Sequence, residues 1–149
     1  QFGEILTMAV LGYFLNHLGF KKVISIGVFA YFLRYLIFGT SSLPLWIIIS
    51  SQAFHGFCYA FFFAAAFIYV DKISENDFRH SAQTVFGIII LGGGPVIGGW
   101  LSGFLQSTFS TNNVLDFSQF WYSISIVGLV ATILFFTSFN DNLTKKEII

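Results

Sequence analysis

The stretch SQAFHGFCYAFFFAAAFIYVD, Ser51–Asp71, decides the fold class of this chain. It runs for twenty residues before its first charged side chain, Asp71, and about 20 apolar residues suffice for a helix to cross the hydrocarbon core of a bilayer. Hydrophobic residues make up 56% of the 149 residues and charged residues only 9%, against roughly 25% charged residues in a soluble domain. The sequence therefore predicts an all-α, polytopic membrane protein.

Short polar breaks divide the chain into five apolar segments, each of which we interpret as a transmembrane helix. The first segment is too short for a complete span, so we expect it to be a truncated helix whose beginning lies outside the chain. Five helices of which the first is truncated indicate the C-terminal portion of a larger multi-pass protein. The predicted spans are residues 1–15, 23–39, 43–70, 82–109 and 117–139.

The basic residues fall in alternate loops and therefore on one side of the predicted membrane. Six of the seven lie in loops 16–22 and 71–81 and in the C-terminal tail. The two other loops, GTSSLPL and STNNVLDF, contain no Lys or Arg. Because basic residues concentrate in cytoplasmic loops, we expect loops 16–22 and 71–81 and the tail to be cytoplasmic. The six residues are Lys21, Lys22, Lys72, Arg79, Lys145 and Lys146.

Unusual residues of four helices share one depth in the membrane. Glu4, Arg34 and Tyr59 each lie twelve residues from a predicted cytoplasmic loop, and Gly94 lies twelve residues after Ala82, the first residue of its span. Twelve residues correspond to about 18 Å at 1.5 Å per helical residue. That depth is near the middle of a core about 30 Å thick. A charged group there is costly unless it is paired or faces a cavity, so the sequence predicts a polar layer at the midplane.

Gln1, Glu4 and Thr7 recur at three-residue spacing and share one helix face. Two other interpretations of Glu4 stay open: a charge that merely begins a helix, and a structural partner for Arg34 on the next helix. For Arg34, snorkelling to the interface or a structural ion pair is a better interpretation than direct contact with a substrate.

The third helix carries a second stripe at helical spacing, formed by Gln52, His55, Gly56, Tyr59 and Phe63. The two aromatic rings, one turn apart, can stack on a flat ligand, while the Gln52 and His55 side chains offer polar contacts. The alternative is ordinary packing and hydrogen bonding between helices.

The fourth helix contains LGGGPVIGGW, residues 91–100. Pro95 removes a backbone hydrogen bond, and glycines such as Gly94 remove side-chain bulk, so we expect a bend or a close helix approach there. The alternative is that this interrupted helix lines a transport cavity.

Two stretches resemble known families. GYFLNHLGFKK, Gly12–Lys22, resembles a cytoplasmic loop motif of the major facilitator superfamily: Gly12, Gly19 and Lys22 match, while Asn16 and His17 stand where the motif has an acid and an arginine. HGFCYAFFFAAAFIYVDKISENDFRHSAQ, residues 55–83, resembles the tenth helix and following loop of the nucleoside:proton symporter family within that superfamily.

The resemblance implies a fold, a localisation and a set of site residues. It implies helices eight to twelve of a twelve-helix transporter in the plasma membrane, the inner membrane of a bacterium. Gln1 and Glu4 fall on the family's Gln-x-x-Glu, which the resemblance implies contacts ribose hydroxyls. Tyr59 and Phe63 fall on the pair implied to hold the base. Beside the residues that the resemblance implies, Gln52 and His55 are further candidate substrate-binding residues. The candidate structural or gating residues are Arg34, Asp71, Arg79, Gly94 and Pro95.

The leading hypothesis is a secondary transporter that carries nucleosides inward with protons. Glu4 is the only acidic residue inside a predicted span, and a carboxylate that alternates between charged and neutral forms can couple protons to transport, so it is the candidate proton carrier. The expected partners are a nucleoside, protons, the lipid bilayer and the missing N-terminal portion of the same chain, with no nucleic acid.

Other functions stay open. A transporter of a sugar or another polyol would use the same hydroxyl-binding groups, and a non-transporting structural membrane subunit would need none of them. An enzyme is not expected, since no nucleophile motif accompanies His55. We expect no cofactor and no metal site, because Cys58 is the single cysteine.

Overall fold

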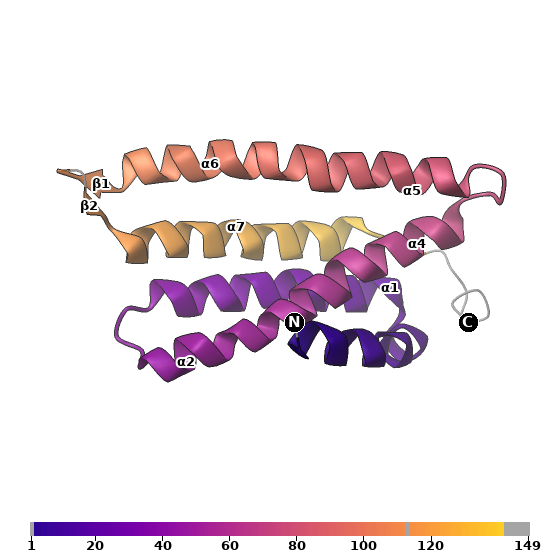
Figure 1. Cartoon of the computed structure of the whole chain (residues 1–149), viewed down its shortest axis with the longest axis horizontal. Coiled ribbons are helices and arrows are strands. Elements are labelled where there is room, and N and C mark those ends of the chain that lie inside the picture. Colours follow the sequence, from indigo (N-terminus) through magenta and orange to yellow (C-terminus); the bar gives the residue numbers. More distant parts are fainter. Residues whose placement is uncertain (1, 113, 142–149) are drawn as a thin grey trace.

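The computed structural model describes residues 2–112 and 114–141 and is helical over most of that length (Figure 1). Long helices run roughly side by side, and a short hairpin joins two of them. The elements are α1 (Phe2–Gly39), α2 (Leu45–Ser50), a 3-10 turn (Ser51–Ala53), α3 (Phe54–Phe57), a π-helix (Cys58–Ala64), α4 (Ala65–Ile73), α5 (Arg79–Gly87), a second π-helix (Ile88–Gly93), α6 (Gly94–Thr108), β1 (Ser110–Thr111), β2 (Val114–Leu115) and α7 (Phe117–Ser138).

Four continuous helical stretches among the described residues are long and apolar enough to cross a membrane: Gly3–Gly39, Leu45–Ile73, Arg79–Thr108 and Phe117–Ser138. The first stretch consists of two segments, because the backbone leaves helical geometry at Gly19 (φ 76°, ψ 169°). Figure 1 shows that the chain doubles back at this turn. Our count of five helices treats these two segments separately, and the all-α, multi-pass architecture is confirmed.

The turn at Gly19 needs a glycine, because a positive φ is unfavourable for residues with a Cβ. The segment that follows is capped from a distant part of the chain. The Phe20 N–H donates to Asp141 Oδ2 at 3.0 Å, so a carboxylate that follows α7 satisfies one of the free amides at this helix start. The end of the described chain is thereby tied to the turn between the two segments of α1.

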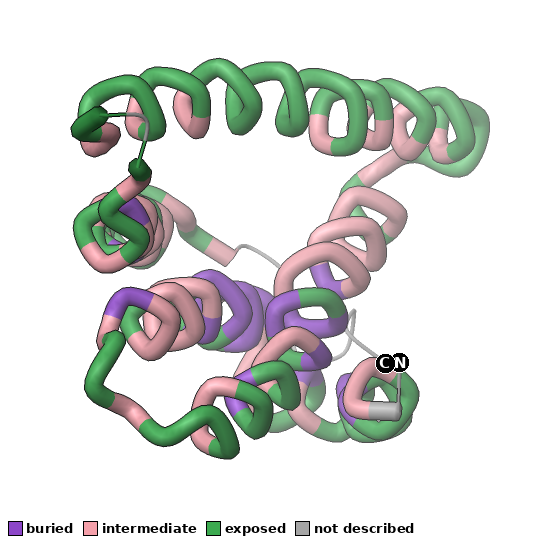
Figure 2. The backbone as a smooth tube through the Cα atoms, turned by 60° about the vertical axis from the view of Figure 1, so that its left-hand side comes forward, coloured by how far each residue is buried: buried purple, intermediate pink, exposed green. Residues whose placement is uncertain are grey.

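The hydrophobic core lies between the two segments of α1 and the first π-helix. Close backbone approach makes it tight: a Cβ on Gly27 would come within 2.6 Å of the Phe62 backbone nitrogen. The purple tube of Figure 2 marks this central region. The core residues are Leu11, Leu15, Phe20, Val23, Ile24, Val28, Ala60, Phe61 and Ala65.

The α7 helix lies along the second segment of α1. A Cβ added to Gly128 would lie 3.3 Å from the Phe32 backbone, so the two helices approach closely there. The buried Ser125 hydroxyl donates to the Phe32 carbonyl at 3.2 Å. The Tyr35 and Trp121 rings stack with centroids 5.4 Å apart. Three contacts along its length therefore fix α7 against α1.

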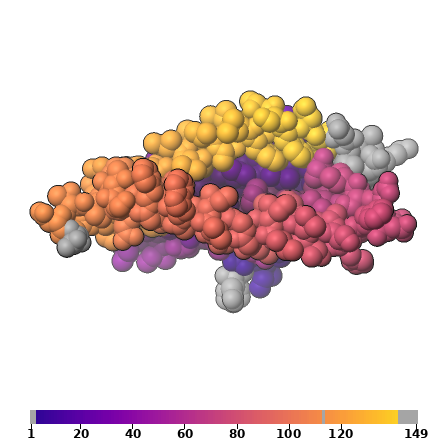
Figure 3. Space-filling model, turned by 90° about the horizontal axis from the view of Figure 1, so that it is seen from above, coloured from indigo at the N-terminus to yellow at the C-terminus, as the bar shows by residue number. Residues whose placement is uncertain are grey.

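The stretch α5–α6 lies on the outside, with no fully buried residue. One of its contacts with the rest of the chain is the T-shaped pair of Phe67 and Phe86, whose ring centroids are 5.1 Å apart. Figure 3 shows α1 visible between α7 and the α5–α6 stretch. Much of the surface of α5–α6 thus remains free of contacts with the rest of the described chain.

The polar turns gather at two ends of the molecule. The Gly19 turn, the loop between α4 and α5 and the end of α7 lie at one end, and the loop after α1 and the β1–β2 hairpin lie at the other (Figure 1). Lys21, Lys22, Lys72 and Arg79 therefore share one end, as the alternation of basic residues predicts. The predicted cytoplasmic tail with Lys145 and Lys146 lies outside the described residues.

Candidate functional site

A contact between two glycines positions the first pair of site residues. A Cβ on Gly56 would lie 2.5 Å from the carbonyl carbon and oxygen of Gly3 and 2.8 Å from the Thr7 hydroxyl. The backbones of α1 and α3 therefore touch at this point. Glu4 follows Gly3 in sequence and His55 precedes Gly56, so the contact brings their side chains together: His55 Nε2 lies 3.5 Å from Glu4 Oε1.

The His55 ring also faces a cation on the second segment of α1. Arg34 Nη1 lies 3.0 Å from His55 Nδ1, and Arg34 Nη2 donates to Gln52 Oε1 at 2.8 Å. Glu4, Arg34, Gln52 and His55 thus form one connected group, which we call the polar cluster. It links the two segments of α1 to the Leu45–Ile73 stretch.

The polar cluster corrects one of the sequence-based interpretations. We considered Glu4 as a direct structural partner of Arg34, whereas the structure places the His55 ring between them. Two carboxylates contact basic side chains among the described residues: Glu4 contacts His55, which is an ion pair only when the ring is doubly protonated, and Asp71 pairs with Arg79. The Arg34 guanidinium does not depend on snorkelling, since it bonds within the protein and lies 5.3 Å from the Phe38 ring centroid.

The hydrogen bonds define the tautomer of His55. Arginine nitrogens only donate, so Nδ1 of His55 must be the acceptor and carry no proton. In the neutral imidazole the proton then resides on Nε2, the atom that faces Glu4. The Glu4 and His55 side chains are 28% and 44% exposed, so both remain accessible to water or a ligand.

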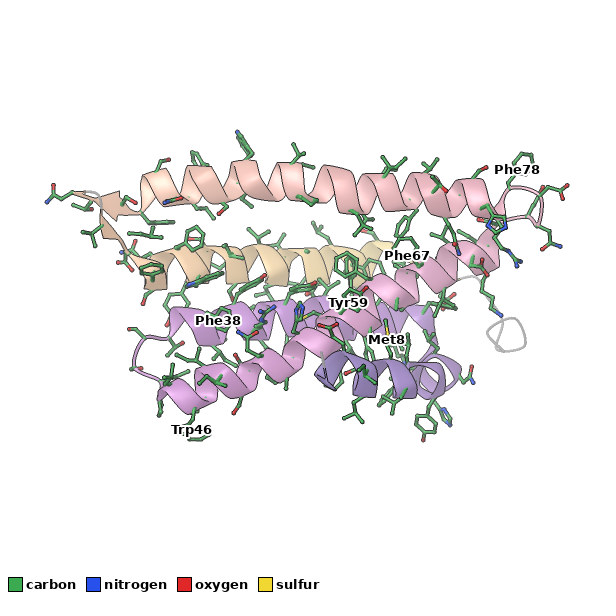
Figure 4. All side chains as sticks on the ribbon, in the orientation of Figure 1. Met8, Phe38, Trp46, Tyr59, Phe67 and Phe78 are labelled. Atoms are coloured by element: carbon green, nitrogen blue, oxygen red, sulfur yellow. The ribbon has the colours of Figure 1, made fainter. Side chains whose placement is uncertain are left out.

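A small cavity of about 130 Å³ lies one helical turn away from the polar cluster. Tyr59 is one turn after His55, and Met8 is one turn after Glu4, so the cavity continues from the pair that the glycine contact creates. Figure 4 shows Met8, Tyr59 and Phe67 near one another, on α1 and the Leu45–Ile73 stretch. We call it the aromatic cavity; its lining residues are Met8, Tyr59, Phe63, Ala64, Phe67 and Leu91.

Tyr59 and Phe63 both line this cavity, with ring centroids 5.9 Å apart and ring planes inclined by 42°. The Tyr59 residue is 42% exposed, so a face of the ring is available to a flat ligand. A volume of about 130 Å³ is below the roughly 300–1,000 Å³ of complete small-molecule sites. The cavity formed by the described residues is therefore too small to be a complete site of that kind.

The stripe predicted on the third helix is divided in two. Gln52 and His55 hydrogen-bond to Arg34, whereas Tyr59 and Phe63 line the cavity. A 3-10 turn spans Ser51–Ala53 and a π-helix spans Cys58–Ala64, so the third helix does not keep 3.6 residues per turn throughout. The polar and aromatic pairs nevertheless follow one another along it, because Tyr59 lies one turn after His55.

The remaining predicted residues lie elsewhere. Asp71 Oδ1 lies 3.5 Å from Arg79 Nε and accepts from Gln83 Nε2 at 3.0 Å, which ties α4 to α5 at the end of the molecule that carries the basic turns. Gly94 and Pro95 begin α6 directly after the second π-helix, and nothing within 4 Å faces Gly94. Close helix packing at Gly94 is therefore not made by the described chain. Gln1 lies outside the described residues.

Four cavity residues escaped the sequence-based reasoning, namely Met8, Ala64, Phe67 and Leu91. Apolar side chains in an apolar span carry no compositional signal, although Met8 is at helical spacing from Glu4 and Leu91 is close to the predicted depth of Gly94. In the part of the chain that the structure describes, no group of three His, Cys, Asp or Glu side chains could hold a metal ion.

Comparison with known proteins gives a consistent picture. A family model described as "Nucleoside H+ symporter" matches residues 1–144. The chain is 26% identical to the xanthosine permease of Escherichia coli, covering 99% of this chain and 36% of that protein. It is 25% identical to the nucleoside permease NupG of Escherichia coli, covering 93% of this chain and 34% of that protein.

A solved structure has the same arrangement. A crystal structure of the nucleoside transporter NupG, determined for a point mutant, superposes with a TM-score of 0.86 at 26% identity, covering 94% of this chain and 36% of that one. The chain thus spans about a third of the length of the relatives that it matches.

Proposed function

The chain belongs to the nucleoside H+ symporter family, and from this premise we propose that it is part of a secondary transporter that imports nucleosides together with protons. The relatives named above are permeases of xanthosine and of nucleosides. A transporter changes no covalent bond in its cargo, so we propose no enzymatic role and no cofactor.

The observation that carries this proposal is the Glu4 carboxylate, which adjoins the aromatic cavity. Glu4 is 3.5 Å from His55 and partly exposed, and the cavity begins one turn along both helices. An ionisable residue within a membrane span marks an ion or substrate pathway by default. The Glu4 carboxylate lies beside the aromatic rings of the cavity, and a cargo that is both flat and polar needs an aromatic surface and a hydrogen-bonding group together.

The cargo is assigned group by group. The Glu4 carboxylate accepts hydrogen bonds from ribose hydroxyls, together with Gln1. The Tyr59 and Phe63 rings stack on the base, since aromatic faces bind nucleobases without requiring a particular sequence of donors. The volume of the aromatic cavity supports a site completed by helices of the transporter that precede this chain.

Family membership supports a proposal for the architecture. We assign residues 1–149 to the C-terminal six-helix half of a major facilitator transporter, as helices eight to twelve. Alternating access would then arise from rocking of this half against the other around the central site. The chain would lie in the plasma membrane, the inner membrane of a bacterium, with the Lys-rich end in the cytoplasm.

Uptake of labelled uridine tests the proposal. The complete transporter is expressed in cells that lack their own nucleoside transporters, and uptake is measured with and without an inward proton gradient. We expect accumulation only with the gradient, and competition by adenosine and xanthosine but not by free ribose. Competition by ribose alone would point to a sugar or polyol as cargo. Absence of all uptake would favour a structural membrane subunit.

A further inference from the structure

The two ring nitrogens of His55 face two different side chains. Nδ1 accepts from the Arg34 guanidinium at 3.0 Å, and Nε2 lies 3.5 Å from the Glu4 carboxylate. A neutral imidazole with its proton on Nε2 can accept from Arg34 and donate to Glu4. A doubly protonated imidazole can donate to Glu4 but cannot accept from Arg34, because Nδ1 then carries a proton and has no free lone pair.

We infer that His55 is a proton-operated switch: in the neutral ring Nδ1 holds Arg34, and in the doubly protonated ring Arg34 is released while Glu4 is held more tightly. A proton from water binds to Nδ1, and no covalent bond other than this N–H forms. Arg34 keeps its own charge throughout, since arginine stays protonated in proteins. Two cations then face each other where a hydrogen bond stood.

Two charged side chains contact the His55 ring. The first segment of α1 contributes Glu4, and the second segment contributes Arg34. Gln52, on the same stretch as His55, shares Arg34 with it and is not ionisable. Histidine is the side chain that ordinarily changes charge between about pH 5 and 8.

Protonation of His55 changes the contacts that Arg34 makes between two helices. With His55 neutral, the guanidinium joins α1 to two residues of the Leu45–Ile73 stretch, Gln52 and His55. After protonation the Gln52 bond alone remains. The role of this switch in transport rests on the proposed function. Protonation of His55 would change how α1 packs against the third span, next to the proposed cargo site. His55 acts through Arg34 and Glu4 and is a positioning residue.

Nitrogen-15 NMR on the wild-type protein tests the switch without transport. The complete transporter is labelled at the histidine rings, and the His55 signals are identified by their loss in His55→Asn, or in His55→Gln if the asparagine variant does not fold. We expect a protonated-type Nε2 signal and an unprotonated-type Nδ1 signal from the neutral ring, and protonated-type signals from both nitrogens after acidification. A neutral ring with its proton on Nδ1, or no change on acidification, would overturn the inference.

The pH profile of uridine exchange tests the role in transport. The amide of His55→Asn can accept from Arg34 but gains no proton on acidification. We therefore expect the ratio of the exchange rates at low and high pH to move toward one, whatever the absolute rate of the variant, while Glu4 keeps its own contribution to the pH dependence. A variant profile with the same pH dependence as the wild type would overturn the inference. If wild-type protein shows no uridine exchange, the proposed function fails instead, and the NMR result still decides the protonation of His55.

Discussion

The contact between Gly3 and Gly56 is asymmetric. A Cβ added to Gly56 would lie 2.5 Å from the Gly3 carbonyl carbon, whereas a Cβ added to Gly3 would meet the Ala53 carbonyl oxygen at an ordinary 3.6 Å. The nearest atoms that a Cβ on Gly56 would meet belong to the Gly3 backbone, which cannot rotate away as a side chain can. This contact sets the register of Glu4 against His55, so it fixes the polar cluster.

The asymmetry predicts different effects of the same substitution. Gly56→Ala should lower the stability of the transporter by about 1–3 kcal/mol, the usual cost of overpacking, and should weaken uridine binding because the Glu4–His55 distance increases. Gly3→Ala should be tolerated, since alanine also favours the helix. Thermal unfolding of both purified variants measures the difference. Equal stability of the two would contradict the close approach.

The aromatic cavity predicts the effect of removing a ring. Tyr59→Ala should raise the Kd for uridine by about 5- to 150-fold, which corresponds to the roughly 1–3 kcal/mol that base stacking contributes. Tyr59→Phe keeps the ring and should stay near wild type. Isothermal titration calorimetry with the purified transporter makes the measurement. Unchanged affinity in the alanine variant would remove Tyr59 from the site.

The cap on the second segment of α1 predicts a graded effect at Asp141. Asp141→Ala should destabilise the protein by about 0.5–2 kcal/mol, because the Phe20 amide loses its acceptor. Asp141→Asn should recover most of that loss, since asparagine caps helices about as well as aspartate. Thermal unfolding at one pH compares the three proteins. The cap would be refuted by an asparagine variant as unstable as the alanine one.

The orientation predicts which loops react from outside the cell. In a background without cysteines, with Cys58→Ala, a membrane-impermeant maleimide should label Ser41→Cys in intact cells, because Ser41 lies in the loop without basic residues. Glu75→Cys, in the loop between α4 and α5, should react only after permeabilisation. Both positions are exposed. The opposite pattern would invert the proposed topology.

Much of the fold could be predicted from the sequence because bilayer thickness and helix geometry leave few options. Counting twelve residues from each loop placed Glu4, Arg34 and Tyr59 at one depth. The structure agrees to the extent that Glu4 and Arg34 meet at His55 and Tyr59 lies one turn further. Depth is readable from sequence, since every helical residue advances by the same rise.

Rotation of each helix about its axis could not be predicted in the same way. The third span contains a 3-10 turn at Ser51–Ala53 and a π-helix at Cys58–Ala64, and no residue type in the sequence indicates either departure from the α-helical period. The useful signal was missed: Gly3 directly precedes Glu4, and Gly56 directly follows His55. A glycine beside a polar residue in each of two spans indicates a close contact that also pairs the polar groups.

The role of Glu4 as proton carrier is the central claim, and Glu4→Gln in the complete transporter tests it most directly. Glutamine keeps a hydrogen-bonding side chain of similar size but cannot lose a proton. Labelled uridine is followed in two assays, gradient-driven accumulation and exchange without a gradient. We predict that accumulation is lost while exchange continues. Undiminished accumulation driven by the proton gradient would contradict the account.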